Sequence, residues 1–109
     1  MKSSTCRENY ICPFEYALEI ISGKWRGLVL FYLGLRGTLR YSQIKRELPT
    51  ITQKMLTQTL RFLENEQLVD RKVYAVVPPK VEYKLTKKGK SLIPILENLQ
   101  EWGKKQLAT

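Results

Sequence analysis

Apolar residues in the first third of the chain recur at intervals of three and four, the spacing of one helix face. Pro13 suits the first position of a helix, because its missing N–H has no helical partner there, and Ser22-Gly23 ends the pattern. A second pattern runs from Trp25 to Gly37 and is apolar nearly all round, which is typical of a central, buried helix. The two stripes are Phe14, Ala17, Leu18 and Ile21, and then Trp25, Leu28, Val29, Tyr32 and Leu33.

The next segment predicts a short strand over 38–40 and two more helices. Tyr41, Ile44 and Leu48 mark a short helix that Pro49 terminates. Thr52 is a good N-cap for a longer helix that ends around Glu66. Its apolar face consists of Leu56, Leu60 and Leu63, with Met55 and Phe62 beside them. Two short helices joined by a tight turn make a helix-turn-helix.

The period changes to two after residue 68, which indicates strands. The alternating positions are Val69, Arg71, Val73, Ala75 and Val77, and then Val81, Tyr83 and Leu85. Pro78-Pro79 lies between them and cannot donate to a β-ladder, so it marks the tip of a hairpin. Thr86 is the predicted cap of a last helix, whose apolar face is Leu92, Ile95, Leu96, Leu99 and Trp102.

These elements predict a fold that is mainly α-helical with a small β-hairpin. We interpret it as a winged helix-turn-helix with additional helices at the N- and C-terminal ends. A length of 109 residues allows little more than one domain. The expected organisation is a flexible polar arm over 1–11 and a single domain over 12–109.

Composition excludes several classes of function. The chain has no histidine, which excludes histidine-based acid–base and nucleophilic catalysis. Its two cysteines are too few for a four-cysteine zinc site. With no phosphate-binding glycine loop and no clustered carboxylates, the sequence predicts no enzyme, no catalytic residue, no metal and no cofactor. It also predicts no signal peptide and no membrane span, and so a cytoplasmic protein.

The net charge of +9 is unevenly distributed. Residues 40–90 hold twelve basic and five acidic residues, a net charge of +7. A basic excess on a helix-turn-helix and hairpin favours nucleic acid as the partner. The first two turns of the fourth helix carry no acid, and their side chains are of the types that read base edges or phosphates. The alternative is an ordinary solvated helix surface. The expected DNA contacts are Arg40, Ser42, Thr52, Gln53, Lys54, Thr57, Gln58 and Arg61, with Lys72, Tyr74 and Lys80 on the hairpin.

Lysines 87, 88 and 90 stand at the wrong end of the last helix for its dipole. We therefore expect an external anion there, and phosphate is the natural one. Surface lysines at such positions cost a few tenths of a kcal/mol.

Four strings carry a resemblance to a known family. They are CPFEYALEIISGKW (12–25), LRYSQIKRELPTITQKMLTQTLRFLENEQLVDR (39–71), VPPKVEYKLTKKGKSL (77–92) and EWG (101–103). In this order and spacing the chain resembles the HxlR-type (DUF24) transcriptional regulators, relatives of the MarR group. The resemblance implies a homodimeric winged-helix DNA binder, usually a repressor, that dimerises through its first and last helices. The expected interface residues are Phe14, Leu18, Leu96, Leu99 and Trp102.

The resemblance also implies that the cysteine before the proline, Cys12, senses oxidants or electrophiles in several members. The expected position of Cys12 at a helix N-cap is consistent with this role, because the dipole stabilises a thiolate there. The alternative is a small apolar residue that packs well. The only other cysteine is Cys6, which matches no family motif.

The working hypothesis is a homodimer on an inverted-repeat operator, with a possible reactive small-molecule effector at Cys12. Two other hypotheses stay open. The domain could be a winged-helix module that binds nucleic acid non-specifically or one that binds a protein, in both cases without sensing oxidants or electrophiles.

Overall fold

The computed structural model describes residues 12–108, most of them helical. The expected arm over 1–11 therefore lies outside the described residues. The order of the elements confirms the winged helix-turn-helix with a helix added at each end. The elements are α1 (Pro13–Ile21), α2 (Arg26–Arg36), β1 (Leu39–Arg40), α3 (Tyr41–Glu47), α4 (Gln53–Asn65), β2 (Val69–Tyr74), β3 (Lys80–Leu85) and α5 (Lys87–Leu107).

The core forms around α2, as its nearly all-round apolar pattern predicts. Val29, Leu30 and Leu33 are at most 1% exposed, and α2 contacts α1, α3, α4, β3 and α5. Thr59 is the one buried polar residue of the described chain, and it lies on the inner face of α4 where the apolar pattern did not place it. Met55 is 40% exposed, so it lies at the edge of that face.

The ends of the helices follow local chemistry. The Thr52 and Thr86 side chains each accept a hydrogen bond from a backbone N–H three residues on, which confirms both predicted caps. Gly37 ends α2 with φ of +87°, a conformation that favours glycine. The end of α4 is different, because Gln67 adopts φ of +61° without being glycine. There the Leu68 N–H donates to the Leu63 carbonyl, and the Gln67 N–H donates to the Glu64 carbonyl, which is a Schellman motif.

A three-stranded antiparallel sheet in the order β1-β3-β2 forms the wing. The predicted hairpin with Pro78-Pro79 at its tip is confirmed, but β2 ends at Tyr74. The expected alternation through Ala75 and Val77 is wrong, because both residues belong to the loop at the tip. Val73 is 56% exposed and Val77 is fully exposed, since this half of the hairpin extends beyond the core and has no layer to pack on.

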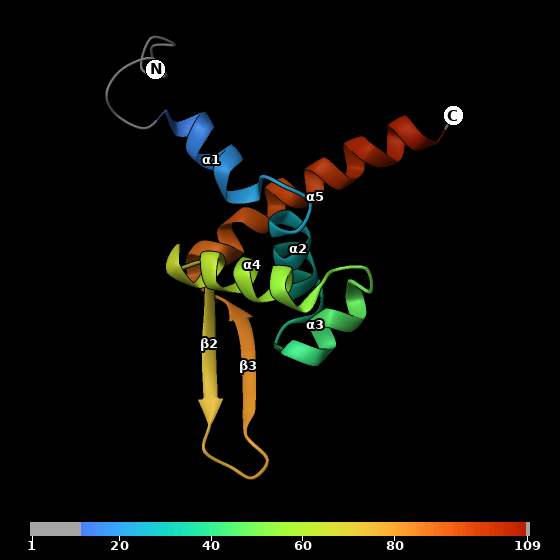
Figure 1. Ribbon diagram of the computed structural model, residues 1–109. Helices are drawn as coiled ribbons and strands as arrows, with labels where there is room; N and C mark the ends of the chain where they lie inside the picture. Colours follow the sequence, from blue (N-terminus) through green and yellow to red (C-terminus); the bar gives the residue numbers. More distant parts are fainter. Residues whose placement is uncertain (1–11, 109) are drawn as a thin grey trace.

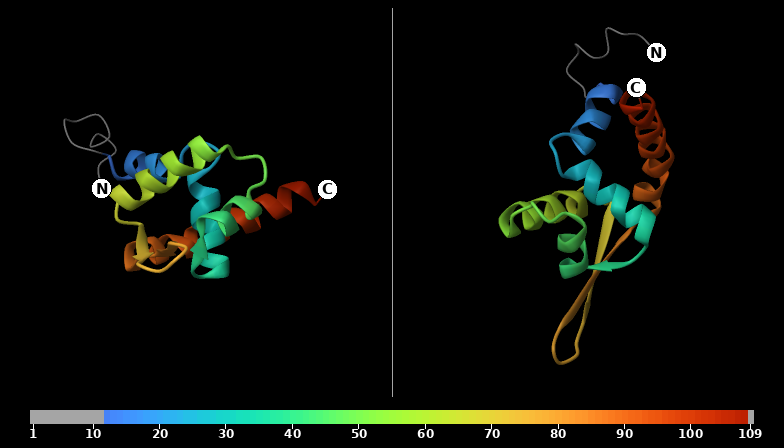
Figure 2. Two further views of the ribbon diagram at one scale, coloured as in Figure 1. Left: turned by 60° about the horizontal axis from the view of Figure 1, so that its bottom comes forward. Right: turned by 90° about the vertical axis from the view of Figure 1, so that its right-hand side faces the viewer.

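The molecule has two distinct ends (Figure 1). The wing points away from the body at one end, with α3 and α4 beside its base. At the other end, α1 and the C-terminal half of α5 project from α2 and spread apart. A view from the side shows α2 between α4 and α5 (Figure 2). None of the helices between residues 12 and 108 combines the length and the hydropathy that a membrane span requires.

Candidate nucleic-acid interface

The helix-turn-helix is held by a buried turn. Ile44, Leu48 and Ile51 are at most 5% exposed, and the Ile51 N–H donates to the Leu48 carbonyl at 3.1 Å. A turn anchored by three apolar side chains fixes the angle at which α4 leaves it. The geometry of α4 is thus set by the core and not by its own exposed surface.

Tyr41 joins the two helices at the exposed side of the motif. Its hydroxyl donates to the Gln53 carbonyl at 2.9 Å and forms a second hydrogen bond of 3.2 Å with the Thr57 hydroxyl. Sequence reasoning placed Tyr41 only on an apolar stripe and missed this contact. The first turn of α4 is therefore tied to α3 as well as capped by Thr52.

Most of the expected reading surface is exposed on one side of α3 and α4. Thr57 is half-buried and shares its hydroxyl with Tyr41, and the Thr52 hydroxyl accepts from the Met55 N–H at 3.1 Å. These two threonines thus have structural partners. The side chains that point to solvent are those of Arg40, Ser42, Gln53, Lys54, Gln58 and Arg61.

Arg61 faces the base of the wing. A recess of about 220 Å³ separates α4 from β2 and β3, and Arg61, Glu64 and Arg71 are among the residues that line it. Arg71 forms an ion pair of 3.5 Å with Glu64, so that carboxylate already has a partner from the wing. The positive charge of Arg61 forms no ion pair with any other described residue.

The wing carries a cluster that sequence reasoning found only in part. The Tyr74 hydroxyl donates to Glu82 at 2.8 Å, and Lys80 pairs with the same carboxylate at 3.4 Å. The Nζ atoms of Lys72 and Lys80 lie 4.9 and 4.7 Å from the centre of the Tyr74 ring. Glu82 is the residue that was missed. The strand register reveals it, because Lys72 faces Glu82 and Tyr74 faces Lys80 across the hairpin.

These contacts shift the pKa values of Glu82 and Tyr74. The hydrogen bond from Tyr74, together with the charge of Lys80, lowers the pKa of Glu82 below its ordinary value. The same hydrogen bond to a carboxylate raises the pKa of Tyr74. Glu82 thus stays ionised, and it holds Tyr74 and Lys80 in place on the wing.

The expectation of an external anion at the start of α5 is not supported for Lys88. Its Nζ donates to the Glu66 carbonyl at 2.8 Å and to the Tyr16 hydroxyl at 2.9 Å. The Glu66 carbonyl at the negative end of the α4 dipole thus provides for Lys88 the compensation that was expected from a phosphate.

The expected dimer surface is largely exposed. Phe14 is 67% exposed, Leu99 51% and Trp102 65%, and Leu18 is also exposed. Ile95 was not among the expected interface residues, but it is exposed beside Leu99 and Trp102 on α5. Leu96 is different, because at 7% exposure it packs into the core of its own chain. We therefore leave Leu96 out of the surface and define the apolar end face as Phe14, Leu18, Ile95, Leu99 and Trp102.

Cys12 is the N-cap residue of α1 and is 1% exposed. It is disulfide-bonded, and its carbonyl accepts from the Tyr16 N–H at 2.9 Å. The Tyr16 hydroxyl in turn donates to Glu66 at 3.3 Å. The first turn of α1 is thus linked through one side chain to the residue that ends α4.

Comparison with known proteins identifies the protein family of this chain. Residues 20–109 match the family described as HxlR-like helix-turn-helix. The chain belongs to this family. A protein of Methanothermobacter thermautotrophicus named as an uncharacterized HTH-type transcriptional regulator is 57% identical over 97 residues, covering 89% of this chain and 73% of its own.

Solved structures of HxlR and MarR type share the fold. The redox regulator HypR in its oxidized form is 49% identical with a TM-score of 0.79, covering 86% of this chain and 96% of its own. A MarR-family regulator from Porphyromonas gingivalis W83 is 37% identical with a TM-score of 0.85, covering 92% and 97%. The HxlR family and these relatives are transcriptional regulators and not enzymes, and this confirms the function class expected from the sequence.

Proposed function

We propose that this transcriptional regulator binds an inverted-repeat operator in double-stranded DNA as a homodimer, in the cytoplasm. The observation that carries the proposal is the exposed surface of α4 before Glu64, the first acidic residue of the helix. Gln53, Lys54, Gln58 and Arg61 offer amide, ammonium and guanidinium groups, which hydrogen-bond to base edges in the major groove.

The wing adds contacts to the DNA backbone. Lys72 and Lys80 both lie against the Tyr74 ring, and Glu82 offsets only part of their positive charge. Ammonium groups held in this way suit phosphate oxygens next to the site that α4 reads. Such contacts would position the protein without reading the sequence.

The apolar end face supports the homodimer. Large apolar side chains that project from α1 and α5 without a covering layer mark an interaction surface. A second copy seated there would place its own α4 about 34 Å away, in the next turn of the major groove. A bound dimer excludes other proteins from that stretch of DNA, so the simplest outcome of binding is repression.

The test uses an operator selected from a randomised duplex pool. Lys54→Ala and Arg61→Ala should each weaken binding about 5- to 150-fold, because each removes about 1–3 kcal/mol of base or phosphate contact. Fluorescence anisotropy at several salt concentrations gives the affinity and the number of phosphate contacts. Lys105→Ala is the matched control, because Lys105 is exposed on α5 at the far end of the molecule.

Wild-type affinity in both α4 variants would refute this assignment of the reading helix. A pool that yields no preferred sequence would favour the non-specific binding module, and a flat response to salt would favour a protein partner.

We also propose that Cys12 makes the regulator responsive to oxidants. Formation of its disulfide takes two electrons and two protons from two thiols and passes them to a peroxide, quinone or diazene. HypR, described as a redox regulator, supports this use of the fold. The link from Cys12 through Tyr16 to Glu66 supplies a route by which a change at Cys12 would move the end of α4.

Cys12→Ser should keep operator binding in reducing buffer and lose the change in affinity that diamide causes in the wild type. Anisotropy with and without diamide measures both, and a thermal melt checks that the buried serine leaves the fold intact. A variant whose affinity still changes with diamide would exclude Cys12 as the sensor.

A further inference from the structure

The turn between α1 and α2 carries an exposed lysine to which the proposed function assigns no role. Lys24 and Trp25 end the first of the four family strings, CPFEYALEIISGKW. The Nζ atom of Lys24 lies 4.8 Å from the centre of the Trp25 ring, and Trp25 itself is half-buried. This ammonium forms no ion pair with any other residue between 12 and 108. The turn therefore presents a positive charge that the described part of the chain does not neutralise.

Arg26 fixes this turn against α4. Its Nη1 atom donates to the Glu19 carbonyl at 2.7 Å and to the Ser22 hydroxyl at 3.1 Å, and it pairs with the Glu19 carboxylate at 2.8 Å. Its guanidinium carbon lies 3.5 Å from the centre of the Phe62 ring on α4, which is a cation–π contact. The charge of Arg26 is thus engaged within the protein, whereas that of Lys24 is exposed beside it.

The turn and the wing lie on opposite sides of the reading surface of α4. At one edge of α4, Met55 lines a recess of about 370 Å³ together with the turn. At the other edge, Glu64 pairs with Arg71 of β2. With about 3.6 residues per helical turn, Lys54 and Gln58 project between these two edges. Figure 1 shows the same arrangement, because the connection from α1 to α2 passes above α4 and the wing extends below it.

We propose that Lys24 binds a phosphate of the DNA backbone that bounds the major groove on the side of α4 away from the wing. A helix in the major groove has a sugar–phosphate backbone on each side. The lysines of the wing reach only one of the two. An exposed ammonium group without a partner in its own chain suits a phosphate oxygen on the other. This inference rests on the proposed function, because α4 must lie in the groove.

The position of the turn determines which phosphates these are. The turn follows α1, which carries Phe14 and Leu18 of the apolar end face. In the proposed dimer the end face lies at the two-fold axis, so the turn lies on the axis side of α4 and the wing on the outer side. Lys24 therefore reaches phosphates between the two half-sites, whereas Lys72 and Lys80 reach phosphates outside them.

The test compares Lys24→Gln with the wild type by fluorescence anisotropy on the selected operator at several salt concentrations. Loss of one phosphate contact should lower the slope of log affinity against log salt by about 0.9, which is about an eight-fold loss of affinity at about 0.1 M salt. Lys24→Arg should keep most of both, because arginine retains the charge.

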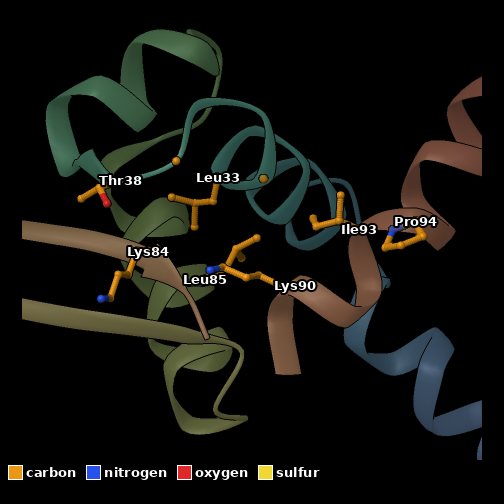
Figure 3. A pocket seen from close by; sticks show the side chains of 9 residues that line it. Leu33, Thr38, Lys84, Leu85, Lys90, Ile93 and Pro94 are labelled. Carbon is orange, nitrogen blue, oxygen red and sulfur yellow. The ribbon is translucent and has the colours of Figure 1, made fainter. Parts of the chain in front are cut away.

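Lys90→Gln is the matched control and should leave the affinity and the slope unchanged. Lys90 is also exposed and forms no ion pair with another residue of the described chain. Its side chain extends from α5 toward β3 (Figure 3), and α2 lies between α5 and α4 (Figure 2). The control thus removes one positive charge on the side of the molecule away from the reading surface.

Ethylation of single operator phosphates maps the contact. Ethylating a phosphate that Lys24 contacts should weaken binding of the wild type and leave binding of Lys24→Gln unchanged. We expect these phosphates between the half-sites. The same comparison with Lys80→Gln should identify phosphates outside the half-sites.

Wild-type affinity and slope in Lys24→Gln would overturn the inference. So would an equal loss in Lys90→Gln, or ethylation effects lost only outside the half-sites. A phosphate contact does not depend on base sequence, so the slope can also be measured on a duplex of random sequence. A lower slope there without any preferred operator would support the Lys24 contact and refute sequence-specific binding. A wild-type slope in Lys24→Gln beside weakened binding of Lys54→Ala would refute the Lys24 contact alone.

Discussion

At the scale of single residues, one carboxylate joins two side chains of the wing. Glu82 accepts a hydrogen bond from Tyr74 and pairs with Lys80, and these contacts lower its pKa. A carboxylate with a lowered folded-state pKa stabilises the fold above its unfolded-state pKa. That contribution is lost as pH falls through the folded-state value. The order of the wing should therefore persist into mildly acidic solution.

Tyr74→Phe removes the first of these contacts, so the pKa of Glu82 should rise toward its ordinary value of 4.5. NMR titration of the Glu82 carboxyl carbon measures this shift. Tyr41→Phe is the control, because it also removes a bonded hydroxyl but leaves the Tyr74–Glu82 pair intact. An unchanged pKa of Glu82 in the Tyr74→Phe variant would show that Lys80 alone lowers it.

Several residue roles could be predicted from sequence, and others could not. Thr52, Thr86 and Pro13 act locally, so their positions alone identified the helix starts. The hydrogen bonds of Glu82 with Tyr74 and of Tyr41 with Thr57 join residues 8 and 16 positions apart, and such partners become visible only once the register and the packing are known. Leu96 was misassigned because an apolar helix position looks the same whether it faces its own core or a second chain.

At the scale of elements, a close contact joins the end of α4 to the start of α5. The Thr86 hydroxyl donates to the Gln67 carbonyl at 2.6 Å, and the Thr86 N–H donates to the Leu68 carbonyl at 3.0 Å. Gly89 packs so closely on the Leu68 carbonyl oxygen that a Cβ there would overlap it. We call residues 66–68 and 86–89 the α4–α5 joint.

Gly89→Ala should destabilise the fold by about 1–3 kcal/mol, because the backbone must shift to admit the methyl group. Urea denaturation gives the free energy of unfolding. At Gly27, by contrast, a Cβ would meet Ile21 at an ordinary 3.8 Å. Gly27→Ala should therefore be neutral or stabilising by up to about 1 kcal/mol. Equal effects of the two substitutions would contradict the close packing of the joint.

The joint also includes a helix end that the sequence marks less clearly than the end of α2. A glycine ends α2, so that boundary was identified in the sequence. α4 ends at Asn65 with Glu66 as its C-cap, close to the predicted end around Glu66. The next residue, Gln67, adopts the left-handed region without being glycine, so no glycine marks this boundary in the sequence. The wing strands end where the core ends, and the apolar alternation of Val73 and Val77 continues past that point. The two-residue period of apolar positions does not reveal how far along a strand the hydrophobic core extends.

At the scale of the whole molecule, the apolar end face should govern assembly. Leu99→Glu and Trp102→Glu place a charge on it and should convert the proposed dimer to monomers, because an unpaired charge in an interface is costly. Light scattering after size exclusion measures the mass. Lys104→Gln changes the net charge by the same amount on a residue paired with Glu101, and it should leave the mass unchanged. A wild type that is monomeric at micromolar concentration would refute the proposed homodimer.

The α4–α5 joint has a consequence for the DNA that this regulator would search. In the proposed dimer, the distance between the two α4 helices is determined by the α4–α5 joint of each copy and by the contact between the two apolar end faces. A rigid joint would keep this distance constant. One extra base pair between half-sites turns the second half-site by about 34–36° around the duplex axis. In the proposed dimer, the phase of acceptable operators would therefore depend on Thr86 and Gly89, neither of which is among the residues expected to contact DNA.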